Sequence, residues 1–532
     1  MHARQRSSTL RLLMTSVAAF GAVAECAFGH QAQPTTNAPT STSNSAARPV
    51  DKAPDAPPAN PTPTDTSHGA SIKPSTPAPA PPGSPFKPFR YDDDFFFLSD
   101  PTKRTDFFDP IKYIPLFEDD PNTFLSFGGE IRSRYEYVSD PAFGLRTNQH
   151  DDYLLQRFLF HGDFQTGPRD GFHTRVFAQF VSGWAWGEEL VKPANQENKL
   201  DLQQGFGELA WGDERNQAVD SFRLRIGRQE MGYGSLRLVA TRDPTNVRIS
   251  FDAVRATAVL DGISIDAFLA RPVTIEKQIF DDGEDDNTTF WGVYAVLPLM
   301  PKKQLGLDLY YFGLDRRSAR FQAGTGDELR HTLGTRLWGR SEGWDHDTEA
   351  VFQFGRFDRP NGSGDDILAW TVASNTGYTF EGAPWSPRLG LKLNIASGDT
   401  DPTDGKLETF NPLFPRNNYF SEAVLLAPYN FFDVHPSVQV RPHRDWLVTV
   451  AWDVFFRTST RDAVYSPTGI VIPAGANRDR FVGSTLSAQA DWNISRNVSW
   501  SITYVHFFPG SVVTSAGGRD VDFVGTWLTF RF

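Results

Sequence analysis

Charged side chains recur at every second position of segments whose other positions are apolar. In one such segment Glu130, Arg132 and Arg134 alternate with Ile131 and Tyr135. A guanidinium group is a planar fork that donates two parallel hydrogen bonds to a carboxylate. A row of arginines on one face of a strand therefore indicates a surface that can bind carboxylate groups in succession.

The same alternation selects the candidate site residues. The basic candidates are Arg132, Arg134, Arg157, Arg175, Arg225, Arg255, Arg336, Lys392 and Arg457, and the acidic candidates are Glu130, Glu208, Glu349 and Asp453. For any one arginine two interpretations are open: it lines a path for a polyanion, or it pairs with a neighbouring carboxylate and braces the interior. For the set as a whole a path for a polyanion is favoured. The interspersed acids would then keep each contact weak enough for conduction.

Nothing in the sequence indicates catalysis. His161 with Asp163, and Asp433 with His435, lie two residues apart on one strand face, but this spacing is common by chance. No G-x-S-x-G nucleophile motif accompanies either pair. The sequence therefore predicts no catalytic residues, no metal ligands and no cofactor.

Eighteen segments carry the two-residue alternation that predicts half-buried β-strands. Their ranges are 124–138, 152–165, 172–182, 200–211, 221–230, 251–260, 263–271, 289–297, 305–313, 329–339, 345–357, 367–380, 388–397, 430–441, 445–457, 480–492, 498–508 and 522–532. Most have about the 9–11 residues that a tilted membrane strand needs. An even number of antiparallel strands can close into a barrel without unpaired edges.

Connections between the predicted strands fall into two length classes. Short turns such as 261–262 alternate with long polar loops, which is the known asymmetry of outer-membrane barrels. The longest loop, 398–429, mixes Gly, Asp, Pro and aromatic residues, and we expect it to fold inward or to cap the outer mouth. Its Asp-rich part at 399–404, and that at 281–286, carry the oxygen ligands that Ca²⁺ uses, although solvated loops are the expectation there.

The free-energy cost of placing a charge in lipid predicts which face of each strand points outward. An arginine on the lipid face near the middle of the bilayer costs about 2–4 kcal/mol. The apolar face of each strand is therefore expected to contact lipid, and the charged face to line the lumen.

The N-terminal region differs in composition from the rest of the chain. Arginines precede the apolar run from Leu12 to Ala24, which predicts a signal peptide that contains the single cysteine, Cys26. A segment rich in Pro, Ala, Ser and Thr follows and predicts disorder. The predicted domains are a signal peptide (1–29), a Pro/Ala/Ser/Thr-rich disordered linker (30–86), a periplasmic lead-in segment (87–123) and an outer-membrane β-barrel (124–532).

Overall composition excludes one class of partner and favours a barrel. The formal net charge is −12, so the protein is not expected to coat nucleic acid. Aromatic residues reach 13% in a chain whose mean hydropathy is −0.40, which suits an aromatic outer face around a wet lumen. A soluble propeller or solenoid is the structural alternative. The signal peptide, the terminal Phe532 and the two classes of loop length disfavour it.

Several motifs within residues 91–532 resemble the alginate export family of outer-membrane proteins. They include Gly128-Gly129-Glu130-Ile131-Arg132, Gly227-Arg228-Gln229-Glu230, Phe251-Asp252-Ala253-Val254-Arg255 and Phe410-Asn411-Pro412-Leu413-Phe414-Pro415. The resemblance implies an all-β fold, a transmembrane antiparallel up-and-down barrel of about 18 strands in the bacterial outer membrane. It also implies an electropositive lumen through which alginate leaves the periplasm.

The function expected from this resemblance is export of an anionic, alginate-like exopolysaccharide. The expected partners are this polysaccharide, outer-membrane lipid and lipopolysaccharide, and periplasmic export components, with the channel itself a monomer. Two alternatives remain: a substrate-selective porin for small anions or sugars, and a structural or adhesin barrel. An enzyme is not expected.

Overall fold

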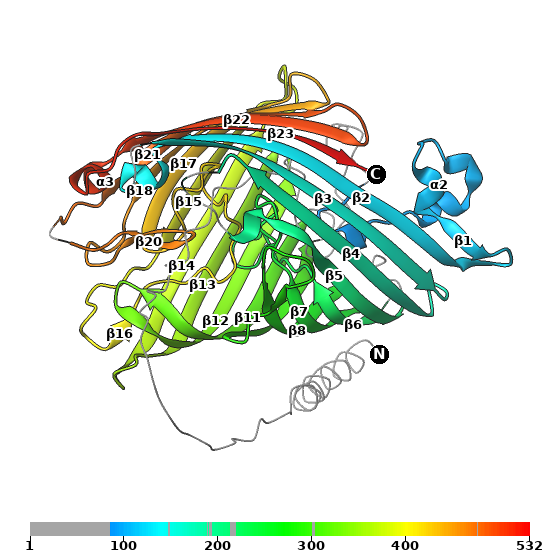
Figure 1. Ribbon diagram of the computed structural model, residues 1–532, viewed down its shortest axis with the longest axis horizontal. Coiled ribbons are helices and arrows are strands. Elements are labelled where there is room, and N and C mark those ends of the chain that lie inside the picture. The colour runs from blue at the N-terminus through cyan, green and yellow to red at the C-terminus, as the bar shows by residue number, and fades with distance from the viewer. Residues whose placement is uncertain are drawn as a thin grey trace, which may run out of the picture. The chain divides into compact units, whose positions relative to one another are not determined.

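The predicted alternation corresponds to a continuous antiparallel ladder in the computed structural model, which describes residues 86–146, 149–188, 190, 194–212, 220–300, 304–475 and 477–532. Eighteen strands follow one another around a closed barrel (Figure 1). They are β2 (Asp120–Ser139), β3 (His150–Thr166), β4 (Phe172–Trp186), β5 (Asn198–Trp211), β6 (Ser221–Gln229), β7 (Phe251–Leu260), β8 (Ile263–Thr274), β10 (Thr288–Met300), β11 (Leu305–Phe321), β12 (Gly324–Ser341), β13 (Trp344–Asp358), β14 (Gly364–Thr379), β15 (Arg388–Ala396), β17 (Phe431–Val440), β18 (Trp446–Phe456), β21 (Phe481–Asn493), β22 (Val498–Pro509) and β23 (Val521–Arg531).

Closure of the barrel uses the last residues of the chain. β2 and β23 pair antiparallel, with Glu130 opposite Arg531. Beyond β23, the backbone of Phe532 exchanges hydrogen bonds of 2.9 and 3.0 Å with Gly129. A Cβ atom at Gly129 would lie 2.6 Å from the backbone C=O oxygen of Leu159 and 2.7 Å from the Phe532 ring, so the approach to the Leu159 backbone requires glycine. Each barrel strand has a partner on both sides, and no open edge faces lipid.

All eighteen predicted strands occur where the sequence placed them, and several are longer. β11 runs to Phe321, whereas the alternation ended at residue 313. β12 begins at Gly324 instead of residue 329. Apolar alternation marks only the part of a strand that contacts lipid, whereas backbone pairing continues into water. The sequence pattern therefore finds the membrane belt and underestimates the strands.

The two faces of the wall have the predicted sidedness. On β15, Leu389, Leu391 and Leu393 point outward and are 50%, 41% and 41% exposed. Lys392 and Asn394 have the opposite parity and point inward, and Asn394 is buried. Outward leucines of this kind contact acyl chains in a membrane, while the polar set faces the interior.

Short elements that the sequence did not predict lie at the strand ends and in the connections. The short strands are β1 (Ile114–Phe117), β9 (Gly283–Glu284), β16 (Lys406–Leu407), β19 (Val464–Ser466) and β20 (Gly469–Ile472), and the helical turns are η1 (Arg90–Asp92), η2 (Phe96–Ser99), η3 (Pro101–Lys103), α2 (Asp109–Lys112), η4 (Pro141–Gly144), η5 (Ala194–Gln196) and α3 (Ser511–Ser515). No helix in the described part of the chain has the length and apolar character needed to cross a bilayer.

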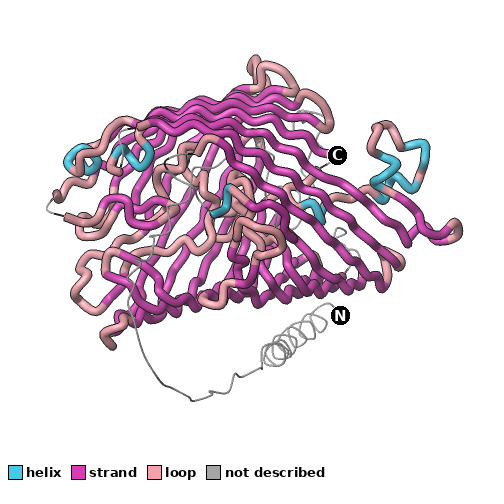
Figure 2. The backbone as a smooth tube through the Cα atoms, in the orientation of Figure 1, coloured by secondary structure: helices cyan, strands magenta, loops and turns pink. Residues whose placement is uncertain are grey.

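Two long connections fold into the barrel interior (Figure 2). Loop 230–250 joins β6 to β7, and loop 397–430 joins β15 to β17. Ala240 N–H donates to the C=O of Phe414, and Phe414 N–H donates to the C=O of Leu238, at 2.9 and 2.8 Å. The expectation that the longest loop folds inward is therefore correct. Both loops pack with inward aromatic residues of the wall, which include Phe268, Phe290 and Phe312.

The N-terminal domain predictions are covered only in part. The predicted signal peptide, 1–29, and the linker, 30–86, lie outside the described residues except for Phe86. The lead-in segment, 87–123, is described, and its β1 pairs with the first residues of β2. A periplasmic location of this segment remains a prediction.

We expect Leu391→Arg to destabilise the barrel by about 2–4 kcal/mol, because Leu391 faces outward in the middle of β15. Urea unfolding of protein folded into phosphocholine vesicles measures the loss. The matched control is Leu389→Arg, on the same face but next to the strand end, where the cost is about 0–1 kcal/mol. Equal losses at the two positions would contradict a depth-dependent contact with lipid.

Candidate functional site

The structure places the predicted path residues on the inner wall of the barrel. Those whose side chains share the inward parity of their strands are Arg132, Arg134, Arg157, Arg175, Arg225, Arg255, Arg336, Lys392, Glu130, Glu208, Glu349 and Asp453. Arg457 directly follows β18, and its guanidinium donates to the backbone C=O groups of Asn477 and Asp479, both at 2.7 Å. Arg457 thus holds the connection between β18 and β21, while the other twelve remain candidates for the path.

Inward arginines of the first strands are paired with carboxylates of their neighbours. Arg175 donates to both oxygens of Asp163, at 2.7 and 2.8 Å. The carboxylate of Glu208 lies between Arg175 and Arg225, 4.0 and 2.6 Å from the two guanidiniums. These pairs join β3, β4, β5 and β6 through their inner faces. They show why guanidiniums can be buried here, since each one has an acceptor.

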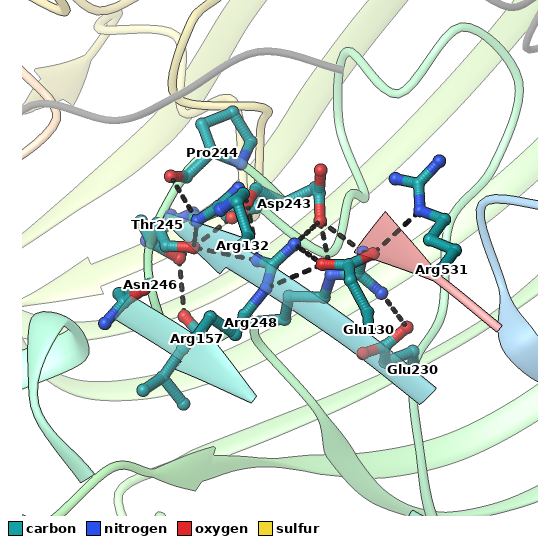
Figure 3. Close-up of polar contacts among 12 residues, drawn as sticks. Glu130, Arg132, Arg157, Glu230, Asp243, Pro244, Thr245, Asn246, Arg248 and Arg531 are labelled. Atoms are coloured by element: carbon teal, nitrogen blue, oxygen red, sulfur yellow. Dashed lines mark hydrogen bonds and ion pairs between the residues drawn. The ribbon is translucent and has the colours of Figure 1, made fainter. Parts of the chain in front are cut away.

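A second network joins the wall to loop 230–250 (Figure 3). Arg157 donates to Glu130 at 3.0 Å and to the carboxylate of Asp243 at 2.9 Å. Arg248, from the same loop, contacts both of these carboxylates. Glu130 also pairs with Arg531 at 2.9 Å, next to the seam that closes the barrel. Two wall strands, the last strand and an outer loop are therefore linked by one cluster of charges.

Backbone carbonyl groups of the same loop accept hydrogen bonds from an arginine of the barrel wall. Arg132 donates to the C=O groups of Asp243 and Thr245, both at 2.9 Å. Burial opposes ionisation of Asp243, but Arg248 and Arg157 hold the pKa of its carboxyl well below the ordinary value. The loop therefore presents a carboxylate and several carbonyl oxygens to the inward arginines.

Loop 397–430 contacts the wall in the same way. The carboxylate of Glu422 lies 3.6 Å from Arg134, which also pairs with Glu136 of its own strand. Asn418 Nδ2 donates to Glu422 at 2.9 Å. Burial raises the pKa of Glu422 to about 7, against the opposing effect of Arg134.

The remaining basic candidates lie on later strands of the wall, beginning with Arg255, which stands opposite Arg225 in the pairing of β6 with β7. Arg255 donates to Asp266 at 2.7 Å, and Arg336 contacts Asp347 at 2.6 Å. Arg237 of loop 230–250 shares Asp347 at 2.8 Å. Lys392 differs, because it has no ion pair within the part of the chain that the structure describes.

Residues of the lead-in segment also lie inside the barrel. Arg90 and Tyr91 are buried, and the Tyr91 hydroxyl donates to the C=O of Glu230 at 3.0 Å. The Tyr91 ring packs edge-on against the inward rings of Phe177 and Phe206. This segment therefore meets loop 230–250 in the lumen. Both the lead-in segment and the loop between β6 and β7 contribute side chains to the interior of the barrel.

Sequence reasoning missed every site residue that lies outside the strands. Alternation identifies an inward position only on a strand, so it could not find Asp243, Arg248 or Glu422. One signal was available, because polar solvated loops rarely carry clusters of large apolar residues. The loops hold buried Met231, Leu238, Val239, Leu413 and Leu425.

The Asp-rich loop at 281–286 has protein partners for much of its charge. Asp282 accepts hydrogen bonds from the Asn198 side chain at 2.9 Å and from the Glu276 N–H at 2.6 Å. Arg271 pairs with Glu284 and Asp286. Asp281 and Asp282 also meet Asp201, with one carboxylate oxygen of each within 4.8 Å of the others, and calcium binding there remains a prediction.

A sequence model of alginate export proteins matches residues 123–526, which is most of the barrel. The chain belongs to the alginate export family. Its fold and family are those of transport channels and porins, not of enzymes, and this exporter-family protein is a channel of the bacterial outer membrane. No curated protein matches its sequence.

Solved porins share the fold of this channel. A BenF-like porin from Pseudomonas fluorescens Pf-5 superimposes with a TM-score of 0.51 at 9% identity, over 77% of this chain and 98% of that one. OccK8 (OprE) of Pseudomonas aeruginosa gives 0.50 at 11% identity, over 77% and 98% of the two chains. OpdO of the same organism gives 0.50 at 11%, over 79% and 98%. Identities this low establish a common fold alone.

We expect Arg157→Ala to raise the single-channel conductance several-fold. The substitution removes one guanidinium from between the carboxylates of Glu130 and Asp243, and their repulsion loosens loop 230–250. Recording in planar bilayers measures the change. The control is Arg356→Ala, whose exposed pair with Asp358 at 3.4 Å should not affect the lumen. If Arg157→Ala conducts like the wild type, this ion pair does not keep the loop in place.

We expect the inward-folded state of loop 397–430 to become less stable, relative to a released state, as the pH rises from about 5 to 7. Glu422 holds its proton up to about pH 7 when packed, but only to about 4.5 when free, so the packed state binds more protons in this interval. Deprotonation therefore favours release, and the open probability in bilayer recordings should rise about tenfold. Glu422→Gln should stay closed and lose this dependence. An identical pH profile in the variant would rule out Glu422 as the titrating group.

Proposed function

We propose that this channel exports an anionic, alginate-like polysaccharide by exchange of partners on its inward arginines. The observation that carries the proposal is that wall guanidiniums are held by groups on loops. Arg157 contacts the carboxylate of Asp243, and Arg134 contacts the side chain of Glu422, which ionises only near pH 7. When ionised, these loop carboxylates stand where uronate carboxylates would bind, because both offer the same two oxygens to a guanidinium fork.

Displacement of the loops leaves the wall arginines ready for the polymer. Once loop 230–250 withdraws, Arg132 loses its carbonyl acceptors and Arg157 loses one carboxylate. These guanidiniums then face the aqueous lumen, where an incoming carboxylate replaces water at the vacated position with charge-assisted hydrogen bonds. Polymer entry and loop withdrawal therefore favour each other.

Acidic residues of the wall limit how tightly the polymer is held. Glu130 and Glu208 belong to strands and stay beside Arg157 and Arg225 when the loops move. They share the guanidiniums with each passing carboxylate and keep each contact weak. Conduction requires sites of this distributed and weak kind.

A porin for small anions or sugars is the second candidate function. It is favoured by the packing of two loops and residues 86–93 inside the barrel, since a channel whose loops stay in place leaves room only for small solutes. The two functions differ in whether a long polyuronate enters.

Current block by polymers in planar bilayers distinguishes the two functions. We expect polymannuronate to block the current, while a neutral dextran of equal length does not. Arg132→Gln combined with Arg134→Gln should weaken the block about tenfold or more, because two charge-assisted bonds are lost. Arg356→Gln, on an exposed pair, serves as the control. If polymannuronate leaves the current unchanged while small anions pass, the export proposal fails and the porin function stands.

A further inference from the structure

Two aspartates and a histidine lie together on the inner wall. Asp433 and His435 are on β17, and Asp453 is on the adjacent β18. One ligand atom of each lies within 4.8 Å of the others, and all three side chains are buried. His435 Nδ1 is 2.7 Å from Asp453 Oδ2. Sequence spacing treated Asp433 and His435 as a chance pair, because the third residue comes from another strand.

This cluster lacks the partner that other inward acids have. Glu208 and Asp308 contact arginines, but Asp433 and Asp453 have no arginine partner within the described residues. Asn394 Nδ2 donates to both oxygens of Asp433, at 2.8 and 3.0 Å. The side chain of Asp453 is only 1% exposed, and its contacts with His435, Asp433 and the Val454 backbone give neither oxygen a well-aligned hydrogen bond within the described residues.

Among the described residues, a lysine of the adjacent strand lies near the two aspartates, but it does not pair with either carboxylate. Lys392 of β15 stands opposite His435 in the strand register. It forms no ion pair with a described carboxylate, although Asp453 and Asp433 are close enough to attract its charge. Two buried carboxylates side by side repel each other unless a proton or a metal cation lies between them. His435 Nδ1 has no hydrogen-bond partner of acceptable geometry there, so a nitrogen ligand is available as well.

We propose that Asp433, His435 and Asp453 bind one divalent transition-metal ion, of which Zn²⁺ is the representative. Two carboxylate oxygens and one imidazole nitrogen are a donor set that Zn²⁺ and similar ions accept, and three protein ligands leave a coordination position open. Asn394 orients Asp433 through its two hydrogen bonds, as outer-shell partners of metal ligands do. Tyr419 of loop 397–430 reaches Asn394 Oδ1 at 3.4 Å, which places the site directly beneath that loop.

Metal titration of the full-length channel in detergent tests the site. After treatment with EDTA and its removal, calorimetry with Zn²⁺ should give about one ion per chain with a Kd in the micromolar range or below. Ca²⁺ should bind far more weakly, because it prefers six to eight oxygen ligands. Co²⁺ should give visible d–d absorption bands whose intensity reports its coordination geometry.

Matched variants identify the ligands. His435→Gln and Asp453→Asn should each weaken Zn²⁺ binding about 100-fold or more, since even outer-shell changes cost 10–100-fold. Asp491→Asn replaces a buried inward acid of β21 that accepts hydrogen bonds from Ser501 and Gln489, and it should bind Zn²⁺ normally. Heat-modifiable electrophoretic mobility shows whether each variant forms the barrel.

Three results would overturn the proposal. The first is wild-type protein that binds well under one Zn²⁺ per chain, which needs no variant to interpret. The second is an affinity that is unchanged by His435→Gln in folded protein. The third is an equal loss in Asp491→Asn, which would place the ion elsewhere.

Discussion

A guanidinium group inside a barrel needs an acceptor, and this requirement organises the interior of the channel. Lipid excludes arginine from the middle of the outer wall, so arginines at that depth point inward. Neighbouring strands supply some acceptors, such as Asp163 for Arg175. Loops supply the others, such as Asp243 for Arg157. The inward folding of the loops is therefore a consequence of charge compensation as much as of apolar packing.

Segments from different parts of the chain meet in the lumen and depend on one another. Tyr91 contacts the carbonyl of Glu230, where loop 230–250 begins. That loop pairs through Ala240 with Phe414 of loop 397–430. Displacement of one segment removes hydrogen-bond partners of the next. The lead-in segment and the two loops are thus connected to one another inside the barrel.

Asp433 and Asp453 are inward acids that are not paired with an arginine of the described residues. Elsewhere an arginine neutralises an inward acid, whereas these two face a histidine, an asparagine and a more distant lysine. In the proposed site, a metal cation from solution neutralises the carboxylates, as the Arg225 guanidinium does at Glu208. The rule is the same in both places, because buried charges of one sign need a partner of the other.

Strand positions, their number and their sidedness could be predicted from the sequence alone. A two-residue repeat is local, so each segment carries its own information about which side chains face lipid. Inward placement of Arg132 and Arg157 followed from this repeat.

The partners of these side chains were decided only by the tertiary structure. Arg157 and Asp243 are 86 residues apart and meet because a loop enters the barrel. Asp453 reaches His435 because β17 and β18 pair in one particular register. Alternation along a strand determines where a side chain points, whereas closure of the barrel and the course of its loops determine what it meets there.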